Sequence, residues 1–367
     1  MADTQDEGDE TVTIPKRAGG SLAISAVGLS KAFGEKTVLD GIDIQVPEGS
    51  VYALLGPNGA GKTTVVRILS TLITADAGAV QVAGCDLAGD PDGVRAAIGV
   101  TGQFSAVDGL LTGRENLRLM TALRHLGRSA GRRRVDELLD RFDLVEAADR
   151  PVSTYSGGMQ RRLDLAMTLV GNPRLIFLDE PTTGLDPRSR RTMWAIIREL
   201  VEDGVTVFLT TQYLEEADEL ADTVAVLDHG RLVAVGTPAE LKRQIPGGHI
   251  RLQFTGAQAL RSAVRSVPSI AADEQALALD VPFDGNGGGT FSSLRGLLDR
   301  LAGAGIGDAE LDGLSVHTPD LDDVFLALTG RPGGREGSAE QDAAARRERN
   351  HEDRQSGQDL AERGTRR

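Results

Sequence analysis

The residues with the clearest chemical purpose form a glycine-rich run that ends in a lysine and two threonines, residues 56–64. Glycines let a chain fold tightly round an anion, so that successive backbone N–H groups point at phosphate oxygens. Lys62 adds a positive charge for the β and γ phosphates, Thr63 offers a hydroxyl to Mg²⁺, and Thr64 can bond another phosphate oxygen. The pattern G-x-x-x-x-G-K-[ST] follows the apolar run 51–55, which is the context that the motif requires. The nucleotide-binding residues predicted in this loop are Gly56, Pro57, Asn58, Gly59, Ala60, Gly61, Lys62, Thr63 and Thr64.

A pair of carboxylates, Asp179 and Glu180, follows the apolar run 175–178. That run has the length of a strand buried on both faces. Successive strand residues point in opposite directions, so the two carboxylates cannot do the same job at the same place. We assign Asp179 to Mg²⁺, and Glu180 to orienting and deprotonating the attacking water. Together with the phosphate loop, this pair predicts ATP hydrolysis.

Between these two elements lies the run Ser-Gly-Gly-Met-Gln, residues 156–160, which we expect to open a helix. A hydroxyl, closely approaching backbone N–H groups and the positive end of a helix dipole all suit a γ-phosphate. An ordinary helix N-cap can have the same composition, and the place of the run between the other two elements favours the phosphate role. The nucleotide contacts predicted here are Ser156, Gly157, Gly158 and Gln160.

In this order, the three elements resemble the ATP-binding subunits of ABC transporters, over roughly residues 22–245. The resemblance implies further site residues. Gln103 looks like the family's glutamine that reaches Mg²⁺ and the attacking water, and Asp186 is similar to its aspartate loop. Phe33 occupies the place of the aromatic that stacks on adenine, although an aromatic packed in a core is the alternative. The implied cofactors are ATP and Mg²⁺, with the metal close to Thr63, Gln103 and Asp179.

One position departs from the family pattern. After the apolar strand 205–209 the family usually places a histidine two residues beyond the first threonine, and here Thr210 and Thr211 are followed by Gln212. Glutamine can donate an amide hydrogen bond, but it cannot carry or relay a proton. The resemblance therefore implies that Gln212 contacts the γ-phosphate and that Glu180 acts alone as the base. A surface residue before the next helix is the alternative for Gln212.

The resemblance also implies partners. In the family, the 156–160 type of run in one subunit faces ATP held by the phosphate loop of another. This chain has one copy of each motif, so we expect a homodimer that buries two ATP molecules. The runs 210–218 and 321–330 resemble the daunorubicin- and doxorubicin-resistance type of exporter ATPase.

The implied function is an ATP-hydrolysing subunit that energises efflux of a lipophilic drug or antibiotic through a separate multi-span membrane permease. Export of a lipid or polysaccharide by the same engine is one alternative. A soluble ABC ATPase acting on ribosomes or DNA is another, which usually has two cassettes in one chain or a long coiled-coil insertion, and neither is found here.

The amino-acid composition limits the possible partners and location of the protein. The 367 residues carry a formal net charge of -14, which argues against broad binding of nucleic acid or anionic lipid. A single cysteine, Cys85, excludes an internal disulfide and fits a reducing compartment. No apolar run approaches the roughly 18 residues that a membrane span needs, and the first residues are polar rather than signal-like. We expect a peripheral protein at the cytoplasmic face of the cell membrane, in contact with it only through the permease.

The positions of glycine and proline and the periodicity of apolar residues predict that the chain has four parts. Residues 1–20 are polar and acidic and are expected to be disordered. An α/β phosphate-loop cassette with a mixed sheet is expected over 21–245, with a helical subdomain at about 104–155 where helical patterns interrupt the alternation of strands and helices. A fresh alternation predicts a small α+β accessory domain over 246–330, and 331–367 is expected to be a disordered tail.

Overall fold

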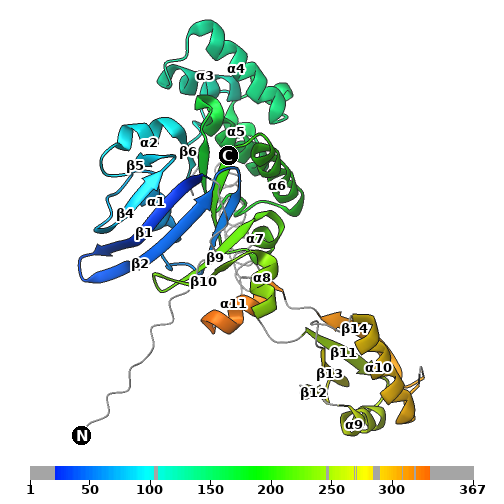
Figure 1. The fold of residues 1–367 in the computed structure, drawn as a ribbon. Helices are drawn as coiled ribbons and strands as arrows, with labels where there is room; N and C mark the ends of the chain where they lie inside the picture. The colour runs from blue at the N-terminus through cyan, green and yellow to red at the C-terminus, as the bar shows by residue number, and fades with distance from the viewer. Residues whose placement is uncertain are drawn as a thin grey trace, which may run out of the picture. The chain divides into compact units, whose positions relative to one another are not determined.

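The computed structural model describes residues 21–102, 106–244, 248–267, 269, 271–283, 290–307, 309–317 and 320–330. These residues divide into two compact units, the first reaching Pro238 and the second running from Ala239 to Gly330 (Figure 1). The segments 1–20 and 331–367, for which disorder is predicted, and Gln103 lie outside the described residues. Among the described helices, none combines the length and the apolar character that crossing a bilayer requires.

A six-stranded sheet forms the centre of the first unit, in the order β10-β9-β3-β8-β7-β6. The strands from β6 to β9 are parallel to their neighbours, and β10 runs antiparallel to β9. β3, β7 and β8 are buried along their whole length, as expected of parallel strands covered on both faces. The bounds are β3 Val51–Leu55, β6 Ile98–Thr101, β7 Leu175–Asp179, β8 Thr206–Thr211, β9 Thr223–Asp228 and β10 Arg231–Gly236.

A second, antiparallel sheet in the same unit has the order β2-β1-β4-β5. Its strands are β1 Leu22–Phe33, β2 Lys36–Pro47, β4 Ala77–Val82 and β5 Cys85–Asp86. Helix α1, Lys62–Leu69, shares one hydrophobic core with both sheets, because its Val65 and Ile68 join residues such as Ile44 of β2 and Phe177 of β7. This packing fixes the start of α1 at the end of β3.

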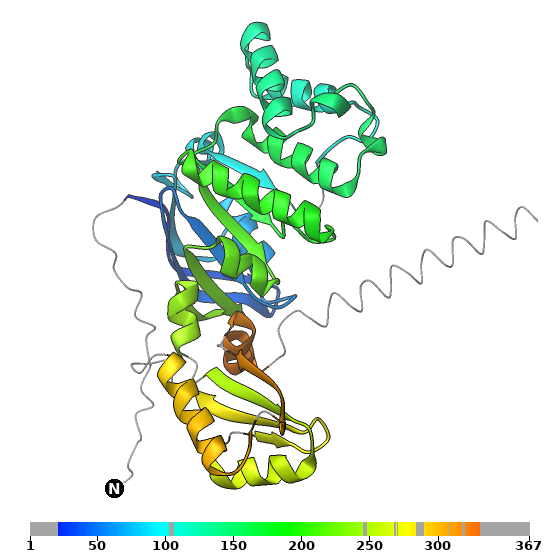
Figure 2. The same ribbon diagram turned by 90° about the vertical axis from the view of Figure 1, so that its right-hand side faces the viewer.

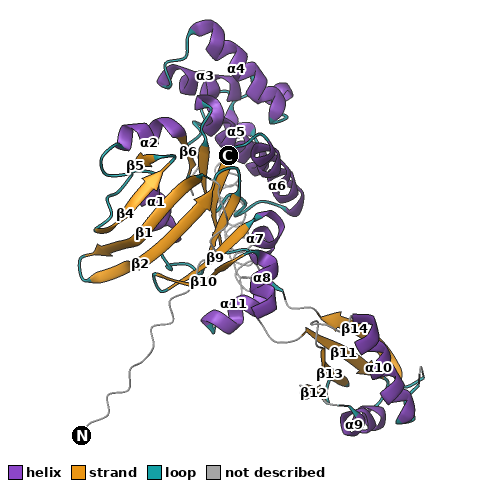
Figure 3. Cartoon of the chain, in the orientation of Figure 1, coloured by secondary structure: helices purple, strands orange, loops and turns teal. Residues whose placement is uncertain are grey.

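Among its described residues, this unit has further α-helices: α2 Pro91–Ala97, α3 Gly113–Leu123, α4 Arg128–Arg141, α5 Gly157–Thr168, α6 Pro187–Glu202 and α7 Leu214–Leu220. α3 and α4 pack on each other beyond the sheets, so that helices dominate this end of the unit (Figure 3). α3 begins with a capping box in which Thr112 and Glu115 satisfy each other's backbone N–H groups. The predicted α/β fold with a mixed sheet and a helical subdomain is confirmed.

The second unit is a small α+β domain with an antiparallel sheet in the order β12-β13-β11-β14. Its elements are α8 Pro238–Gln244, which begins at the last residue of the first unit, β11 Gly248–Phe254, α9 Ala257–Ser266, β12 Ala271–Asp273, β13 Ala278–Phe283, α10 Thr290–Gly303, β14 Leu311–His317 and α11 Leu321–Thr329. The chain order from β11 to β14 and this strand order make a ferredoxin-like split β-α-β motif. Its own core joins Ile250 and Leu252 of β11 to Leu260 of α9 and Leu297 of α10. Figure 2 shows the helices of this unit lying along its sheet.

Candidate active site

The phosphate loop, residues 56–61, connects the carboxyl end of the buried strand β3 to the first turn of α1. Packing requires glycine at two of its positions. A Cβ at Gly56 would lie 2.3 Å from the backbone oxygen of Leu227, and one at Gly61 would lie 2.8 Å from Leu39 Cδ2. Gly61 also has a φ of 116°, which L side chains rarely adopt. A side chain at either position would therefore displace the loop from its neighbours.

Lys62, the first residue of α1, is folded back over this loop with an exposed fraction of 4%. Its ammonium donates to the carbonyl oxygen of Gly56 at 2.7 Å and to that of Pro57 at 3.2 Å. Nζ also lies 3.6 Å from Glu180 Oε1. Burial lowers the pKa of Lys62, and the charges of Glu180 and Asp179 oppose that shift. A buried ammonium held this way favours any anion that approaches the loop.

The two carboxylates after β7 have different surroundings, as the sequence predicts. Asp179 is 3% exposed and accepts hydrogen bonds from Thr210 Oγ1 at 2.5 Å and from Thr63 Oγ1 at 3.4 Å. Glu180 instead faces Lys62 and accepts from Thr183 Oγ1 at 3.3 Å. The structure thus brings Lys62, Thr63, Asp179 and Glu180 together at the carboxyl ends of β3, β7 and β8. Thr63 and Asp179 offer hard oxygen donors of the kind that Mg²⁺ prefers.

The run 156–160 opens α5, as predicted. Ser156 caps the helix by accepting from the backbone N–H of Met159 at 3.3 Å. Gly157 faces open space, whereas a Cβ at Gly158 would lie 2.6 Å from Ser189 Oγ. The side-chain amide of Gln160 donates to the backbone oxygens of Val152 and Tyr155, so it holds the segment before the helix. No hydrogen bond or ion pair between described residues joins 156–160 to 56–64.

Comparison with known proteins identifies the family. The family model described as "ABC transporter" matches residues 39–183. The daunorubicin resistance ATP-binding protein DrrA2 of Streptomyces coeruleorubidus is 48% identical over 313 residues, covering 84% of this chain and 95% of that protein. The chain belongs to the ABC transporter ATP-binding proteins. It is an ATPase of this family, whose hydrolysis is coupled to transport.

Two further similarities extend this finding. The Nod factor export ATP-binding protein I of Ralstonia nicotianae is 36% identical and covers 85% of this chain and 95% of that protein. A solved dimeric ATP-binding cassette in a post-hydrolysis state, bound to ADP and Pi, matches with a TM-score of 0.53 and 26% identity. It covers 58% of this chain and 98% of its own. The phosphate-loop cassette predicted from the sequence is therefore confirmed as the ABC fold.

The structure places three other predicted residues of this ABC ATPase at the ends of separate elements. Phe33, at the end of β1, is 52% exposed, with Lys31 Nζ at 5.4 Å from its ring centroid, so the alternative of a core aromatic is wrong. Asp186 caps α6: it accepts from the backbone N–H groups of Ser189 and Arg188, each at 2.9 Å, and from Ser189 Oγ at 2.7 Å. These hydrogen bonds, above all those of Ser189, lower the pKa of Asp186. Gln212 is half-buried directly after β8.

Sequence reasoning missed Glu216, on α7 just beyond Gln212. Its side chain is fully buried and accepts from Thr182 Oγ1 at 2.8 Å and from Trp194 Nε1 at 3.2 Å. Burial raises the pKa of this carboxyl group. Glu216 thereby ties the segment after Glu180 to the helix that follows Gln212. A glutamate at this position of an amphipathic helix gives no local signal that separates it from its exposed neighbour Glu215.

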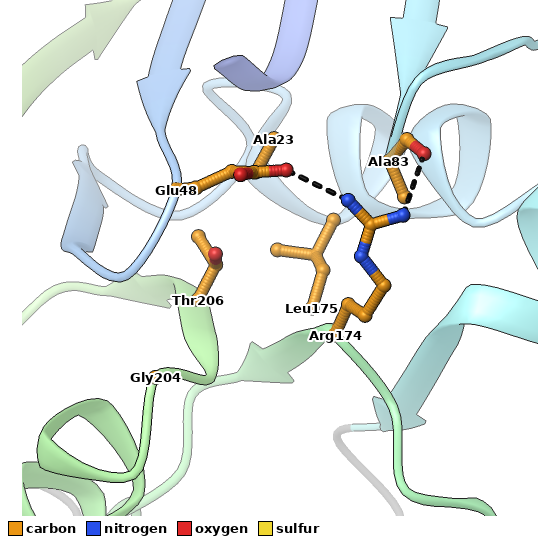
Figure 4. A pocket seen from close by; sticks show the side chains of 7 residues that line it. All are labelled: Ala23, Glu48, Ala83, Arg174, Leu175, Gly204 and Thr206. Atoms are coloured by element: carbon orange, nitrogen blue, oxygen red, sulfur yellow. Dashed lines mark hydrogen bonds and ion pairs between the residues drawn. The ribbon is translucent and has the colours of Figure 1, made fainter. Parts of the chain in front are cut away.

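A small hollow at the opposite end of the ABC sheet is separate from the candidate site. It is lined by residues that include Arg174, Glu48 and Thr206, near the amino ends of β7 and β8 (Figure 4). Arg174 pairs there with Glu48 at 2.8 Å and donates to the backbone oxygen of Ala83 at 3.4 Å. The charges of Arg174 and Glu48 balance each other, and none of the predicted nucleotide-binding residues lines this hollow.

Proposed function

We propose that this ATPase is the energising subunit of an exporter for a lipophilic drug or antibiotic. In this proposal it works as a homodimer, bound to a separate multi-span permease at the cytoplasmic face of the cell membrane. The observation that carries the hydrolytic part is the meeting of Lys62, Thr63, Asp179 and Glu180 at one end of the sheet. The similarity to a daunorubicin resistance ATP-binding protein over 84% of the chain supports the cargo class.

Each residue then has one role. Lys62 and the N–H groups of the phosphate loop bind the β and γ phosphates, and Phe33 stacks on the adenine. The hydroxyl of Thr63 and the carboxylate of Asp179 fit Mg²⁺, since both are hard oxygen donors and their oxygens lie 3.4 Å apart. When bound, Mg²⁺ would neutralise charge on the β and γ phosphates. Glu180 orients the attacking water and accepts its proton, and Gln103 and Gln212 are assigned contacts with the water and the γ-phosphate.

The homodimer rests on the separation of two elements that both suit phosphate. Ser156 caps α5 and Gly157 faces open space, and no hydrogen bond between described residues joins them to the phosphate loop of their own chain. A nucleotide held at Lys62 would therefore be covered by the helix start of a second copy, with the two copies related by a two-fold axis. The solved cassette that resembles this fold is itself described as dimeric.

Histidine at position 212 is expected to preserve hydrolysis in the Gln212→His variant. Imidazole can donate the same kind of hydrogen bond from its ring nitrogen to a γ-phosphate oxygen. Because histidine titrates near pH 6.5, the variant should gain a pH dependence between about pH 6 and 7 that the wild type lacks. Steady-state kcat measured from pH 5.5 to 8.5 checks this result. A large loss at every pH would mean that the amide makes a contact that imidazole cannot replace.

To test the cargo assignment, the permease is first identified by its copurification with the protein from membranes. The full-length protein and this permease are then expressed together in cells. We expect lower sensitivity to daunorubicin and doxorubicin than in cells that carry the Glu180→Gln variant, which is matched in structure but inactive. Unchanged drug sensitivity, together with altered export of a lipid or polysaccharide, would transfer the proposal to the other cargo class. Recovery with ribosomes alone would contradict the transport role.

A further inference from the structure

Arg161 lies one turn into α5, directly beyond the helix start at 156–160, and its side chain is 12% exposed. It donates to three consecutive backbone oxygens of the segment that carries the two carboxylates. The distances are 3.1 Å to Asp179, 3.3 Å to Glu180 and 2.9 Å to Pro181. The same group donates to the backbone oxygen of Gly102 at 3.0 Å. A planar guanidinium has five N–H donors in a fixed fork, so it can bind several carbonyl groups at once, which a lysine cannot.

The segment held by Arg161 is conformationally strained. Glu180 has a φ of 50°, in the left-handed region that a residue with a Cβ seldom adopts. Such a conformation is unfavourable and persists only where the surroundings fix it. On the amide side, the N–H of Glu180 donates to the backbone oxygen and to Oγ1 of Thr210, both at 3.1 Å. On the carbonyl side, Arg161 supplies the restraint.

Asp164, one turn further along α5, completes the arrangement. It is 3% exposed, pairs with Arg161 at 3.3 Å and accepts from the backbone N–H of Ala106 at 3.2 Å. Burial raises the pKa of Asp164 and lowers that of Arg161, while each charge opposes the shift of the other. The pair therefore restrains Gly102, which directly follows β6, and also Ala106. These restraints add to the one on the turn that carries Glu180.

We infer that Arg161 is a positioning residue for hydrolysis, which holds the strained turn of Glu180 so that its carboxylate faces Lys62 and the γ-phosphate. Asp164 keeps the guanidinium oriented and charge-balanced. The inference rests on the proposed function, because it takes Glu180 as the base. It adds a physical link, since the helix that opens with the phosphate-facing run 156–160 is the same helix that supports the catalytic turn of its own chain.

The first test is the Arg161→Lys variant of the full-length protein. Lysine keeps the positive charge beside Asp164 but loses the fork that spans three carbonyls. We expect kcat to fall on the order of 10- to 100-fold, because a small displacement of a catalytic group has that effect, while the Kd for ATP stays close to that of the wild type. A wild-type kcat, or an equal loss of ATP affinity, would overturn the inference.

Arg162 provides the matched control in the Arg162→Lys variant. Its side chain is comparably shielded, at 17% exposed, but donates to the backbone oxygen of Phe142 at 2.8 Å and to Asp143 Oδ2 at 3.1 Å, in the helical part of the unit. We expect near-normal hydrolysis. If Arg161→Lys does not fold, the double variant R161M/D164N removes both charges together, which buried pairs tolerate better than the loss of one partner. It should fold and still hydrolyse slowly, and a wild-type kcat in it would refute the inference.

Mixed dimers separate positioning from general damage. A chain carrying both R161K and E180Q, paired with a wild-type chain, should retain about half of the wild-type hydrolysis, because one of two equivalent sites is intact. The same substitutions placed on opposite chains should leave only the slow rate of R161K. Equal activity in the two arrangements would overturn the inference. Unimpaired hydrolysis by E180Q alone would instead refute the proposed function, so the two failures are distinguishable.

Discussion

We expect the Glu180→Gln variant to bind ATP and to hydrolyse it about 10²- to 10⁴-fold more slowly than the wild type, a loss on the order of 3–5 kcal/mol of barrier stabilisation. Glutamine has nearly the same shape and can still accept the hydrogen bond from Thr183, so the turn should keep its conformation. It cannot accept a proton from water. Lys62 loses the carboxylate 3.6 Å away, and the bound phosphates replace that negative charge. Single-turnover hydrolysis and equilibrium binding of ATP give the two quantities.

The same variant should accumulate as an ATP-bound dimer, since hydrolysis is the step proposed to separate the subunits. Size-exclusion chromatography with light scattering measures this, with and without ATP and Mg²⁺. Glu202→Gln is the control, because Glu202 lies exposed at the end of α6, far along that helix from its cap at Asp186. It should behave as the wild type. Undiminished hydrolysis by Glu180→Gln would remove Glu180 from its role as the base.

Much of the site could be predicted because most of its residues belong to short, contiguous sequence motifs. The glycine pattern of residues 56–61 reports a requirement that packing imposes, although Leu227 and Leu39, which enforce it, come from β9 and β2. The apolar runs before Gly56 and before Asp179 identified the buried parallel strands β3 and β7, and parallel strands bring their carboxyl ends to one edge. The cap at Asp186 followed by Pro187 is also a local signal of a helix start.

The residues that sequence reasoning missed act through partners that lie in other segments of the chain. Arg161 binds backbone oxygens, which every residue has, so nothing in the run 156–164 indicates where its guanidinium points. Glu216 is recognised only once Thr182 and Trp194, from two other segments, are placed around it. The left-handed φ of Glu180 is equally invisible, because glutamate is not a residue type that favours it. The contacts of Arg161, the contacts of Glu216 and the φ of Glu180 all depend on how distant segments of the chain are arranged.

The second large effect is expected from mixing two inactive variants. Lys62→Met removes the ammonium that binds the phosphates. Gly157→Asp places a carboxylate at the start of α5, where the fold has open space but where a γ-phosphate from a second copy would be repelled. Each variant alone should be nearly inactive, because both of its sites carry the defect. After subunit exchange, a mixed dimer has one site with an intact Lys62 and an intact Gly157, the latter from the other chain.

Mixing equal amounts should therefore restore hydrolysis to about a quarter of the wild-type rate, since about half of the dimers are mixed and each has one intact site of two. A chain that carries both substitutions, mixed with Lys62→Met, is the control: no dimer then has an intact Lys62, and no recovery is expected. Full hydrolysis by Gly157→Asp alone would mean that this helix start does not face a phosphate. Failure to recover, in variants shown to fold and to exchange subunits, would mean that each chain completes its own site. That result would contradict the proposed dimer, which takes 156–160 and 56–64 of one chain to serve different sites because no hydrogen bond between described residues joins them.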